Sequence, residues 1–494
     1  MNGGFVSTLV RTVACVTFFS LSPVLSGEKS PAPENVLPAV RSYAIVASQA
    51  VMKDPAWKAA TVTALQKKYP QAQLYVFEKR PEEVKAALAQ QMPQYTAFVV
   101  RPEEAGVQFT ITVSNFCRAL DSDPYVDTLW SVITGYDPES AQKLAEAGPI
   151  AIRRALDCSG MDLTAFAEAW RYTEDHRGTM NHWKRGAMSE PASLPCDTDN
   201  TQGVLERLQK DRIQFLATSG HATQHNWDMG YSGPNLWMEH KEGRLVARDT
   251  KKQVFPVTQT EPKVYFANGN CLIGDIDRQD CMALSWMRDG AVRQMMGYTV
   301  TTWFGAQGWG ALGLFVDGSG LYSANEAFHF TNSSIVESLV KTSQELALPE
   351  LLTARLGKIR QVNYPMTAGL QKWSEQHKGE PGTDERLKQT VGQLHDRDVV
   401  CFYGDPALDA RIAEGRYALQ PWTQNEAGLS LKIRVLQDVP AKPLWVQLPG
   451  SWTYDSVEPK PEFAIDNLLR FPAAARTRGD VIAIRVLGAR RKGQ

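Results

Sequence analysis

The sequence predicts an α/β protein in which two parallel-sheet subdomains lie side by side and a small β-sandwich follows them. Short apolar runs alternate with stretches of helical spacing over residues 41–100, and this alternation returns after Thr201. Beyond Pro421 the pattern changes to alternating apolar and polar residues, interrupted by proline and glycine. Strands that alternate with helices build a parallel sheet covered on both faces, whereas short alternating strands build an antiparallel sandwich.

We expect the two subdomains over residues 41–150 and 151–420, and the sandwich over residues 421–494. In the first subdomain, strands are predicted at residues 43–47, 73–77 and 95–100, and helices at residues 55–69, 81–91, 116–133 and 138–147. In the second, strands are predicted at residues 214–218, 263–267, 290–298 and 399–403, and helices at residues 203–210, 280–289, 326–346 and 385–394. The sandwich strands are predicted at residues 429–436, 444–448, 456–459, 463–471 and 481–487.

Length and charge narrow the class of protein. The 494 residues amount to about three domains at roughly 150 residues each. Lys and Arg number 53 against 54 Asp and Glu, so the net charge is −1. This balance disfavours nucleic acid or an anionic membrane surface as the main partner, since both favour a basic excess. The composition is that of a soluble globular protein.

The first residues have the pattern of a secretory signal peptide. Arg11 precedes an apolar run over residues 13–21, and small residues follow that run. The run is too short to span a bilayer, and the small residues offer a cleavage site near Ser26. We therefore expect removal of residues 1–26 from a secreted or periplasmic protein, with a membrane anchor as the alternative.

Proline-rich residues 27–40 are expected to form a linker into the first subdomain. No later run approaches the length of a membrane-spanning helix. Six cysteines follow the signal peptide, which is too few for a disulfide scaffold, and no CxxC pair occurs. If one of them is a catalytic thiol, at least one of the other five is also unpaired.

Two reactive side chains follow predicted strands. Residues 214–218 lead into Ser219, Gly220 and His221, and residues 263–267 lead into Cys271. Because parallel strands deliver their carboxyl ends to one crevice, His221 and Cys271 can meet there. A thiolate is a nucleophile, and an imidazole can take its proton or protonate a leaving amine. Taken singly, this cysteine is also compatible with a buried small hydrophobe and this histidine with a capping residue.

Further segments in this order resemble the gingipain-like peptidases of the caspase–legumain clan of cysteine peptidases. A helix over residues 282–286 is followed by Gly290-Ala291-Val292 and a strand, and a later strand ends in Gly404-Asp405-Pro406. The resemblance covers about residues 41 to 490 as motifs in order. It implies a caspase-like catalytic unit followed by an immunoglobulin-like domain.

The resemblance also implies roles for individual residues. His221 corresponds to the general acid/base and Cys271 to the nucleophile, with the backbone N–H groups of Ala222 and Cys271 forming the oxyanion hole. The family usually has glycine after the histidine, and alanine does not readily adopt a positive φ. An acid that orients the histidine is expected upstream, and the sequence leaves four candidates: Asp157, Asp162, Glu174 and Asp175.

Other features point to alternative ligands. His221 and His225 have the spacing of zinc ligands on a helix, but the glutamate of HExxH is missing. Asp275 and Asp277 form either a solvated acidic turn or a structural calcium site, although the spacing is not that of an EF-hand loop. Trp303 and Trp309 lie in a glycine-rich segment, expected to be a loop, and line a substrate pocket or pack in the core.

Together these patterns predict a secreted cysteine endopeptidase that forms a thioester on Cys271, acts on protein or peptide substrates and requires no cofactor. The rival interpretation is an exported binding module on the same fold that has lost efficient catalysis. The alanine at position 222 is the main argument for that rival.

Overall fold

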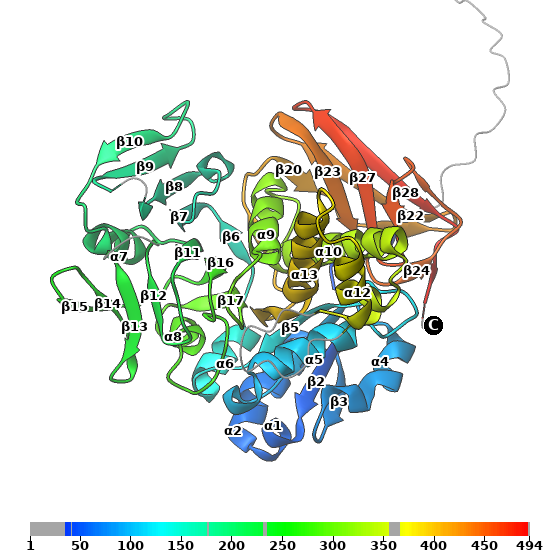
Figure 1. Cartoon of the computed structure of the whole chain (residues 1–494), viewed down its shortest axis with the longest axis horizontal. Helices are drawn as coiled ribbons and strands as arrows, with labels where there is room; N and C mark the ends of the chain where they lie inside the picture. Colours follow the sequence, from blue (N-terminus) through cyan, green and yellow to red (C-terminus); the bar gives the residue numbers. More distant parts are fainter. Residues whose placement is uncertain (1–34, 41, 175–176, 231–234, 355–365, 493–494) are drawn as a thin grey trace, which may run out of the picture.

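The computed structural model describes residues 35–492, except residues 41, 175–176, 231–234 and 355–365. The expected signal peptide, residues 1–26, lies outside the described residues. Figure 1 shows an α/β body with the C-terminal strands gathered on one side of it and the sheet of β13 to β15 on the opposite side. No helix in the described part of the chain is long and apolar enough to cross a membrane.

A twelve-stranded sheet forms the centre of the molecule. Its order is β10 (Ala192–Pro195), β9 (Thr179–Lys184), β8 (Glu168–Arg171), β7 (Arg154–Cys158), β11 (Phe215–Gly220), β16 (Lys263–Asn270), β17 (Val292–Tyr298), β18 (Val400–Gly404), β5 (Leu129–Ile133), β4 (Tyr95–Val99), β2 (Tyr43–Ser48) and β3 (Gln73–Phe77). Strands β2, β4, β5, β11, β16 and β18 are buried along their whole length. Continuous apolar runs buried on both faces are typical of parallel strands covered by helices.

The predicted α/β class is confirmed, and the two expected sheets are joined into one. Strands β7, β8, β11, β16 and β17 are parallel neighbours in the later half, and β2 to β5 are parallel neighbours in the first half. Strand β18 links the halves, since it runs antiparallel to β17 and parallel to β5. The carboxyl ends of the parallel strands in the later half therefore lie along one edge of the sheet.

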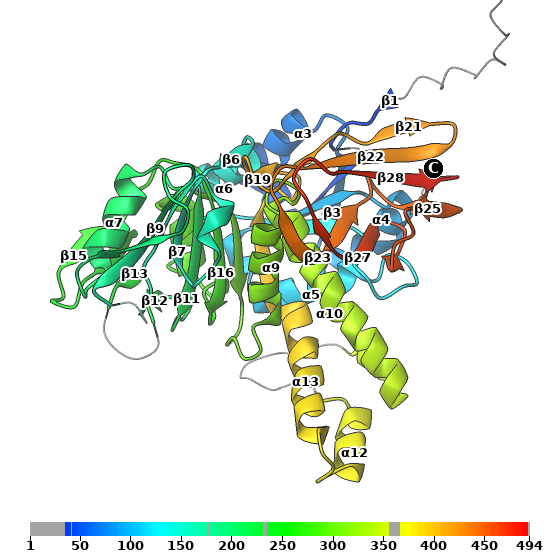
Figure 2. The same cartoon turned by 90° about the horizontal axis from the view of Figure 1, so that it is seen from above.

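Helices cover the sheet and extend beyond it. Those of the first half are α1 (Gln49–Lys53), α2 (Pro55–Lys58), α3 (Ala64–Lys68), α4 (Lys85–Gln91), α5 (Val107–Cys117) and α6 (Pro138–Ala145). The later ones are α7 (Thr201–Lys210), α8 (Met282–Arg288), α9 (Ala306–Asp317), α10 (Ala324–Leu346), α11 (Glu350–Thr353), α12 (Ala368–Gln376) and α13 (Thr383–Val399). Figure 2 shows α10 and α13 projecting together from the body, with α12 packed near the far end of α13.

The segment after residue 417 is antiparallel throughout. One sheet contains β1 (Asn35–Val36), β20 (Tyr417–Leu419), β21 (Thr423–Asn425), β22 (Gly428–Val435), β25 (Ser456–Glu458) and β28 (Val481–Leu487). A second contains β23 (Val439–Gln447), β26 (Phe463–Ala464) and β27 (Leu468–Arg476). In β22, Leu431 and Ile433 are buried while Lys432 between them is exposed, as the period of two requires. The kinship of this sandwich to immunoglobulin domains stays a prediction.

Three small sheets complete the fold. They are β12 (Asn226–Asp228) with β13 (Trp237–Lys241), β14 (Arg244–Arg248) and β15 (Val254–Pro256), then β6 (Ile150–Ile152) with β19 (Ala410–Ile412), and β24 (Trp452–Thr453) with β29 (Arg490–Arg491). The first of these was not anticipated from the sequence. Its first strand, β12, begins five residues after His221.

Three predicted elements were wrong, and the expected linker contains a strand. A single strand was expected over residues 463–471, but Phe463–Ala464 and Leu468–Arg476 form two antiparallel strands, β26 and β27. A helix was expected over residues 116–133. Helix α5 instead ends at Cys117, and the buried run Leu129–Ile133 forms strand β5. A short apolar run cannot be assigned to helix or strand by periodicity alone. Trp309 lies on helix α9 and not in a loop. Within the expected linker, Asn35–Val36 pairs with β21.

The glycines around Trp309 allow helix α9 to pack closely against its neighbours. A Cβ at Gly308 would lie 2.1 Å from the carbonyl oxygen of Asn268, and one at Gly310 would lie 2.6 Å from Thr331. These glycines allow α9 to pack closely against β16 and α10. They are therefore packing residues of a helix and not the sign of a mobile loop.

Candidate active site

The pairing of β11 with β16 brings the two predicted catalytic residues together. The strands are parallel, and Gly220 is the register partner of Asn270. His221 and Cys271 are the next residues on each strand, and neighbouring strands lie about 4.8 Å apart. The Asn270 side chain joins the two ends, because its Nδ2 donates to the carbonyl oxygen of Gly220 at 3.1 Å.

Both strand ends turn sharply at these residues. Gly220 has a φ of +115°, and a Cβ there would lie 2.4 Å from the carbonyl oxygen of Asp228. Leu272, directly after the cysteine, adopts a φ of +60° although it is not glycine. Left-handed backbone at a bulky residue is unfavourable and recurs at functional sites. The sharp turns place His221 and Cys271 at the sheet edge and not in the core.

The Cys271 thiol differs from the other described cysteines. It is half-buried, and the backbone N–H of Thr302 donates to its Sγ at 3.3 Å. Burial raises the pKa of each of the other five, which keeps them as unreactive thiols: Cys117, Cys158, Cys196, Cys281 and Cys401. All six described cysteines are free.

His221 lies in a tight hairpin that leads into β12. Ala222 and Trp227 pair as an antiparallel bridge, and the N–H of Asp228 donates to the carbonyl oxygen of His221 at 2.8 Å. This register places Asp228 directly opposite His221 with both side chains on one face. The Trp227 indole points to the other face, where its Nε1 donates to the carbonyl oxygen of Ser219.

Asp228 is a functional candidate that sequence reasoning missed. Burial raises the pKa of its carboxyl, and the charge of His221 opposes this shift. Its Oδ1 is buried and has no hydrogen-bond partner among the described residues. A carboxylate held opposite an imidazole can orient the ring and stabilise its protonated form. The orienting acid was expected upstream of the histidine. The short segment between His221 and Trp227, however, indicates a hairpin.

The upstream acids have other partners. Asp157 accepts the backbone N–H groups of residues 159–161 and the guanidinium of Arg171 at 2.6 Å. Asp162 caps a short helix and pairs with Arg416 at 2.6 Å. Glu174 reaches the backbone of Gly230, next to the His221 hairpin. Asp175 lies outside the described residues. Glu174 is therefore the upstream candidate nearest to the site.

Two backbone N–H groups were predicted to form an oxyanion hole. The hydrogen bonds of this bridge are formed by His221 and Thr223, the residues on either side of Ala222. The N–H of Ala222 itself therefore points away from β12. Ala222 is not among the residues with positive φ. Alanine consequently fits this position without backbone strain. The assignment of Ala222 and Cys271 to an oxyanion hole stays a prediction.

The two tryptophans expected to line a substrate pocket have different surroundings. Trp303 is half-buried against the apolar cluster between α10 and α13. Trp309 is 42% exposed, and its ring would lie 3.2 Å from a Cβ at Gly269, two residues before Cys271. An exposed aromatic ring beside the cysteine strand is well placed to contact a substrate, whereas Trp303 mainly packs.

The predicted metal ligands form hydrogen bonds with other protein groups. The Nε2 of His225 lies 3.1 Å from Asp277, and its Nδ1 lies 3.0 Å from the carbonyl oxygen of Asp280. Asp275 accepts the N–H of Val107 at 2.9 Å. Burial raises the pKa of the Asp275 carboxyl. These carboxylates have separate partners, and calcium at this turn stays a prediction.

One acidic group elsewhere is compact enough to be considered for a cation. In the described chain, Asp121, Asp123 and Asp127 bring their carboxylate oxygens within 4.8 Å of one another. The ammonium of Lys492 lies 3.2 Å from Asp121 and already supplies a positive charge there. Burial raises the pKa of Asp127 to about 9, so that this member is a neutral acid at pH 7.

Comparisons with known proteins find similarity only in outline. No protein-family model and no curated protein sequence matches the chain. The solved structure of the Arg-specific cysteine proteinase gingipain R aligns with 91% of this chain and 92% of its own, at 10% identity and a TM-score of 0.41. A second solved protease structure aligns with 90% and 95%, at 10% identity and a TM-score of 0.38. Similarity at this level carries no conclusion about activity.

Proposed function

We propose that the chain is a secreted cysteine endopeptidase with Cys271 as nucleophile and His221 as general acid/base. The observation that carries the proposal is the register of β11 and β16, in which Gly220 faces Asn270. A half-buried thiol with an N–H donor and an exposed imidazole follow these two residues directly. These groups are the ones that acyl transfer through a thioester requires.

The reaction proceeds in two halves. The Cys271 thiolate attacks the peptide carbonyl carbon, and the resulting oxyanion is held by the backbone N–H groups of Ala222 and Cys271. Protonated His221 donates its proton to the leaving amine as the C–N bond breaks. His221 then takes a proton from water, which hydrolyses the thioester and frees the thiol. No organic cofactor is needed for these steps.

Two further residues have supporting roles in this proposal. Asp228 is a positioning residue that holds the His221 ring through its opposed carboxylate. Trp309 contributes an aromatic wall to the substrate pocket on the Cys271 side. The calcium of the alternative interpretation, at Asp275 and Asp277, has no step in the reaction.

The proposal includes the organisation predicted from the sequence. Residues 1–26 are removed on export, residues 41–150 and 151–420 form the two α/β subdomains, and residues 421–494 form an immunoglobulin-like sandwich. Protein or peptide is the substrate, and neither nucleic acid nor a membrane takes part.

A covalent probe tests the proposal directly. Mature protein, from residue 27 onward, is incubated with a set of peptidyl ketones that differ in the side chain next to the reactive carbon. Labelling that maps to Cys271 and is lost in His221→Ala supports the peptidase. Alkylation of Cys271 by iodoacetamide without labelling by any peptidyl ketone, and without cleavage of a peptide library, supports the binding module instead.

A further inference from the structure

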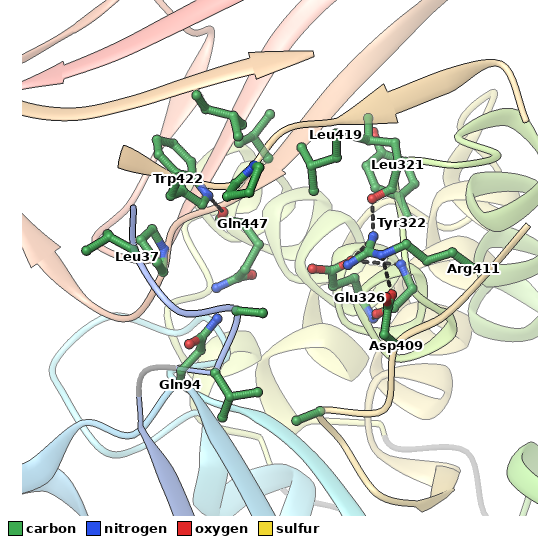
Figure 3. Close-up of a pocket in the computed structure, with 18 of the residues that line it drawn as sticks. Leu37, Gln94, Leu321, Tyr322, Glu326, Asp409, Arg411, Leu419, Trp422 and Gln447 are labelled. Atoms are coloured by element: carbon green, nitrogen blue, oxygen red, sulfur yellow. Dashed lines mark hydrogen bonds and ion pairs between the residues drawn. The ribbon is translucent and has the colours of Figure 1, made fainter. Parts of the chain in front are cut away.

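A cavity of about 450 Å³ lies where the sandwich meets the α/β body (Figure 3). Its walls come from the N-terminal segment 36–40, the start of β4 and the start of α10, together with segments 406–411 and 419–422 and strand β23. We call it the junction cavity. It lies at the amino end of β4, whereas His221 and Cys271 lie at the carboxyl ends of their strands. It is therefore separate from the candidate active site.

Most of the junction cavity is apolar. Leu37, Leu321 and Trp422 face it from three different segments, as Figure 3 shows. Val36 and Leu419 at this cavity are 67% and 38% exposed, which makes them two of the seven exposed large apolar side chains in the described chain. Exposed apolar side chains gathered around a cavity mark a binding surface.

One end of the cavity is charged. Arg411 donates to Asp409 at 2.7 Å and lies 2.8 Å from Glu326, and it also donates to the carbonyl oxygen of Leu321. Among the described residues that line the cavity, these three are the only charged ones, so two carboxylates share one guanidinium and their summed charge is −1. Glu326 is nearly buried, and its side chain is 10% exposed.

The negative charge of Glu326 affects the pKa of a neighbouring side chain. Burial raises the pKa of the Tyr95 hydroxyl, and Glu326 raises it further while Arg411 opposes the shift. A negative charge on a nearly buried carboxylate such as Glu326 attracts a cation more strongly than the same charge in water does. An anion would instead meet Glu326 and Asp409 with no unshared positive charge.

We propose that the junction cavity binds a small amphipathic cation, an organic molecule with an apolar body and one ammonium or amidinium group. Its volume falls in the range of roughly 300–1,000 Å³ that suits drug-sized molecules. The apolar body packs on Leu321, Leu419 and Trp422, and the cationic group lies near Glu326 and Asp409. This inference does not depend on peptidase activity.

Binding here joins three parts of the chain. The ligand contacts the N-terminal segment 36–40, the α/β body and the sandwich, none of which alone forms the cavity. A ligand that binds only the assembled state stabilises it by mass action. We therefore expect the cation to raise the Tm of the protein and to protect the junction from proteolysis.

The test compares two probes of nearly equal shape and opposite charge, 4-phenylbutylamine and 4-phenylbutanoate, on the mature protein. Titration calorimetry and Tm shifts measure their binding. We expect the amine to bind at least roughly 10-fold tighter than the carboxylate, which corresponds to about 1.4 kcal/mol. Equal binding, tighter binding of the carboxylate, or no binding of the amine at about 5 mM overturns the proposal.

Matched variants identify the site. Asp409→Asn removes one charge at the cavity from a side chain that is 63% exposed, and Glu375→Gln removes one charge from an exposed position on α12, far from the cavity. Of these two charge variants, only Asp409→Asn should weaken binding of the amine, by roughly 3- to 10-fold. Leu419→Asn at the rim should weaken both probes. Equal effects of Asp409→Asn and Glu375→Gln, with Leu419→Asn unchanged, place the binding elsewhere and reject the cavity.

Discussion

The two halves of the central sheet differ in the local structure that follows the carboxyl ends of their strands. In the first half, β2 ends at Ser48, whose hydroxyl accepts the N–H of Val51 at 3.3 Å and donates to Glu104 at 2.7 Å. Glu104 in turn accepts the N–H of Arg101 at 2.9 Å, directly after β4. The polar groups at these ends serve helix capping and short-range backbone hydrogen bonds.

In the later half, neither β11 nor β16 runs directly into a helix. His221 enters a hairpin, and Cys271 enters an irregular loop that reaches α8 only at Met282. Their side chains are therefore not needed to cap a helix. The comparison teaches that parallel topology offers a crevice in both halves, while local turn structure decides which half can carry chemistry.

The strongest test of this comparison exchanges one strand-end residue in each half. Cys271→Ala should abolish peptidase activity, since loss of a nucleophile costs on the order of 10⁶ in rate. Ser48→Ala should leave activity unchanged and lower the free energy of unfolding by about 1 kcal/mol, because it removes a helix cap. Activity assays and chemical denaturation measure both. Wild-type turnover in Cys271→Ala would contradict the assignment, and Cys196→Ala controls for thiol loss in general.

The histidines of the later half provide the next test. His221→Ala should lower kcat/KM by roughly 10²–10⁴-fold, the usual contribution of one positioned proton-transfer group. His225→Ala should have little effect on kcat/KM, because that ring binds Asp277 and the carbonyl oxygen of Asp280. Equal losses in the two variants, together with inhibition by chelators, would indicate zinc instead.

Ala222 tests the predicted oxyanion hole. Ala222→Pro deletes an N–H donor and should cost roughly 10²–10³ in kcat, whereas Ala222→Gly should preserve it. Circular dichroism must first show that the proline variant is folded, because proline also restricts the residue before it. Full activity in a folded Ala222→Pro would mean that another donor serves the hole.

Sequence patterns predicted the candidate pair His221 and Cys271 but not the residue opposite His221. Strand-end placement predicted His221 and Cys271, because apolar runs of this kind identify parallel strands. Asp228 was missed because the orienting acid was expected upstream of His221, whereas a hairpin places this acid downstream and opposite His221. Strand β5 was taken for helix because Leu129–Ile133 is a short apolar run that fits either structure. Trp309 was placed in a loop because glycines needed for close helix packing look like loop residues.

Asp228 gives a smaller expected effect. Asp228→Asn should lower kcat/KM by about 10- to 100-fold, because it removes the negative charge that faces the imidazolium. It should also move the alkaline limb of the pH profile to lower pH, because the proposed mechanism needs protonated His221 and a negative neighbour no longer stabilises the imidazolium. Iodoacetamide alkylation of Cys271 across the pH range reports the same change without a substrate. A loss of activity with an unshifted profile would assign Asp228 a purely structural role.

The smallest expected effect concerns stability in the first half. Burial raises the pKa of Asp127 from an unfolded value near 4 to about 9. A raised folded-state pKa stabilises the protein below the unfolded value, and this stability is lost as the pH rises from 4 to 9. Asp127→Asn should therefore raise the free energy of unfolding at pH 8 by on the order of 1–3 kcal/mol, with little change at pH 4. Thermal unfolding in EDTA at both pH values measures this, and equal effects at the two pH values would contradict it.

The short strand β1 has a consequence for the order of folding. Asn35 pairs with Gln424, so a segment that precedes the central sheet in sequence hydrogen-bonds to a strand 389 residues later. Contacts this distant in sequence form late, because the intervening chain must first be ordered. Residues 35–36 leave the ribosome long before their partner does. We therefore expect the N-terminal segment to close over the junction as a late step of folding, after the central sheet and the sandwich have formed.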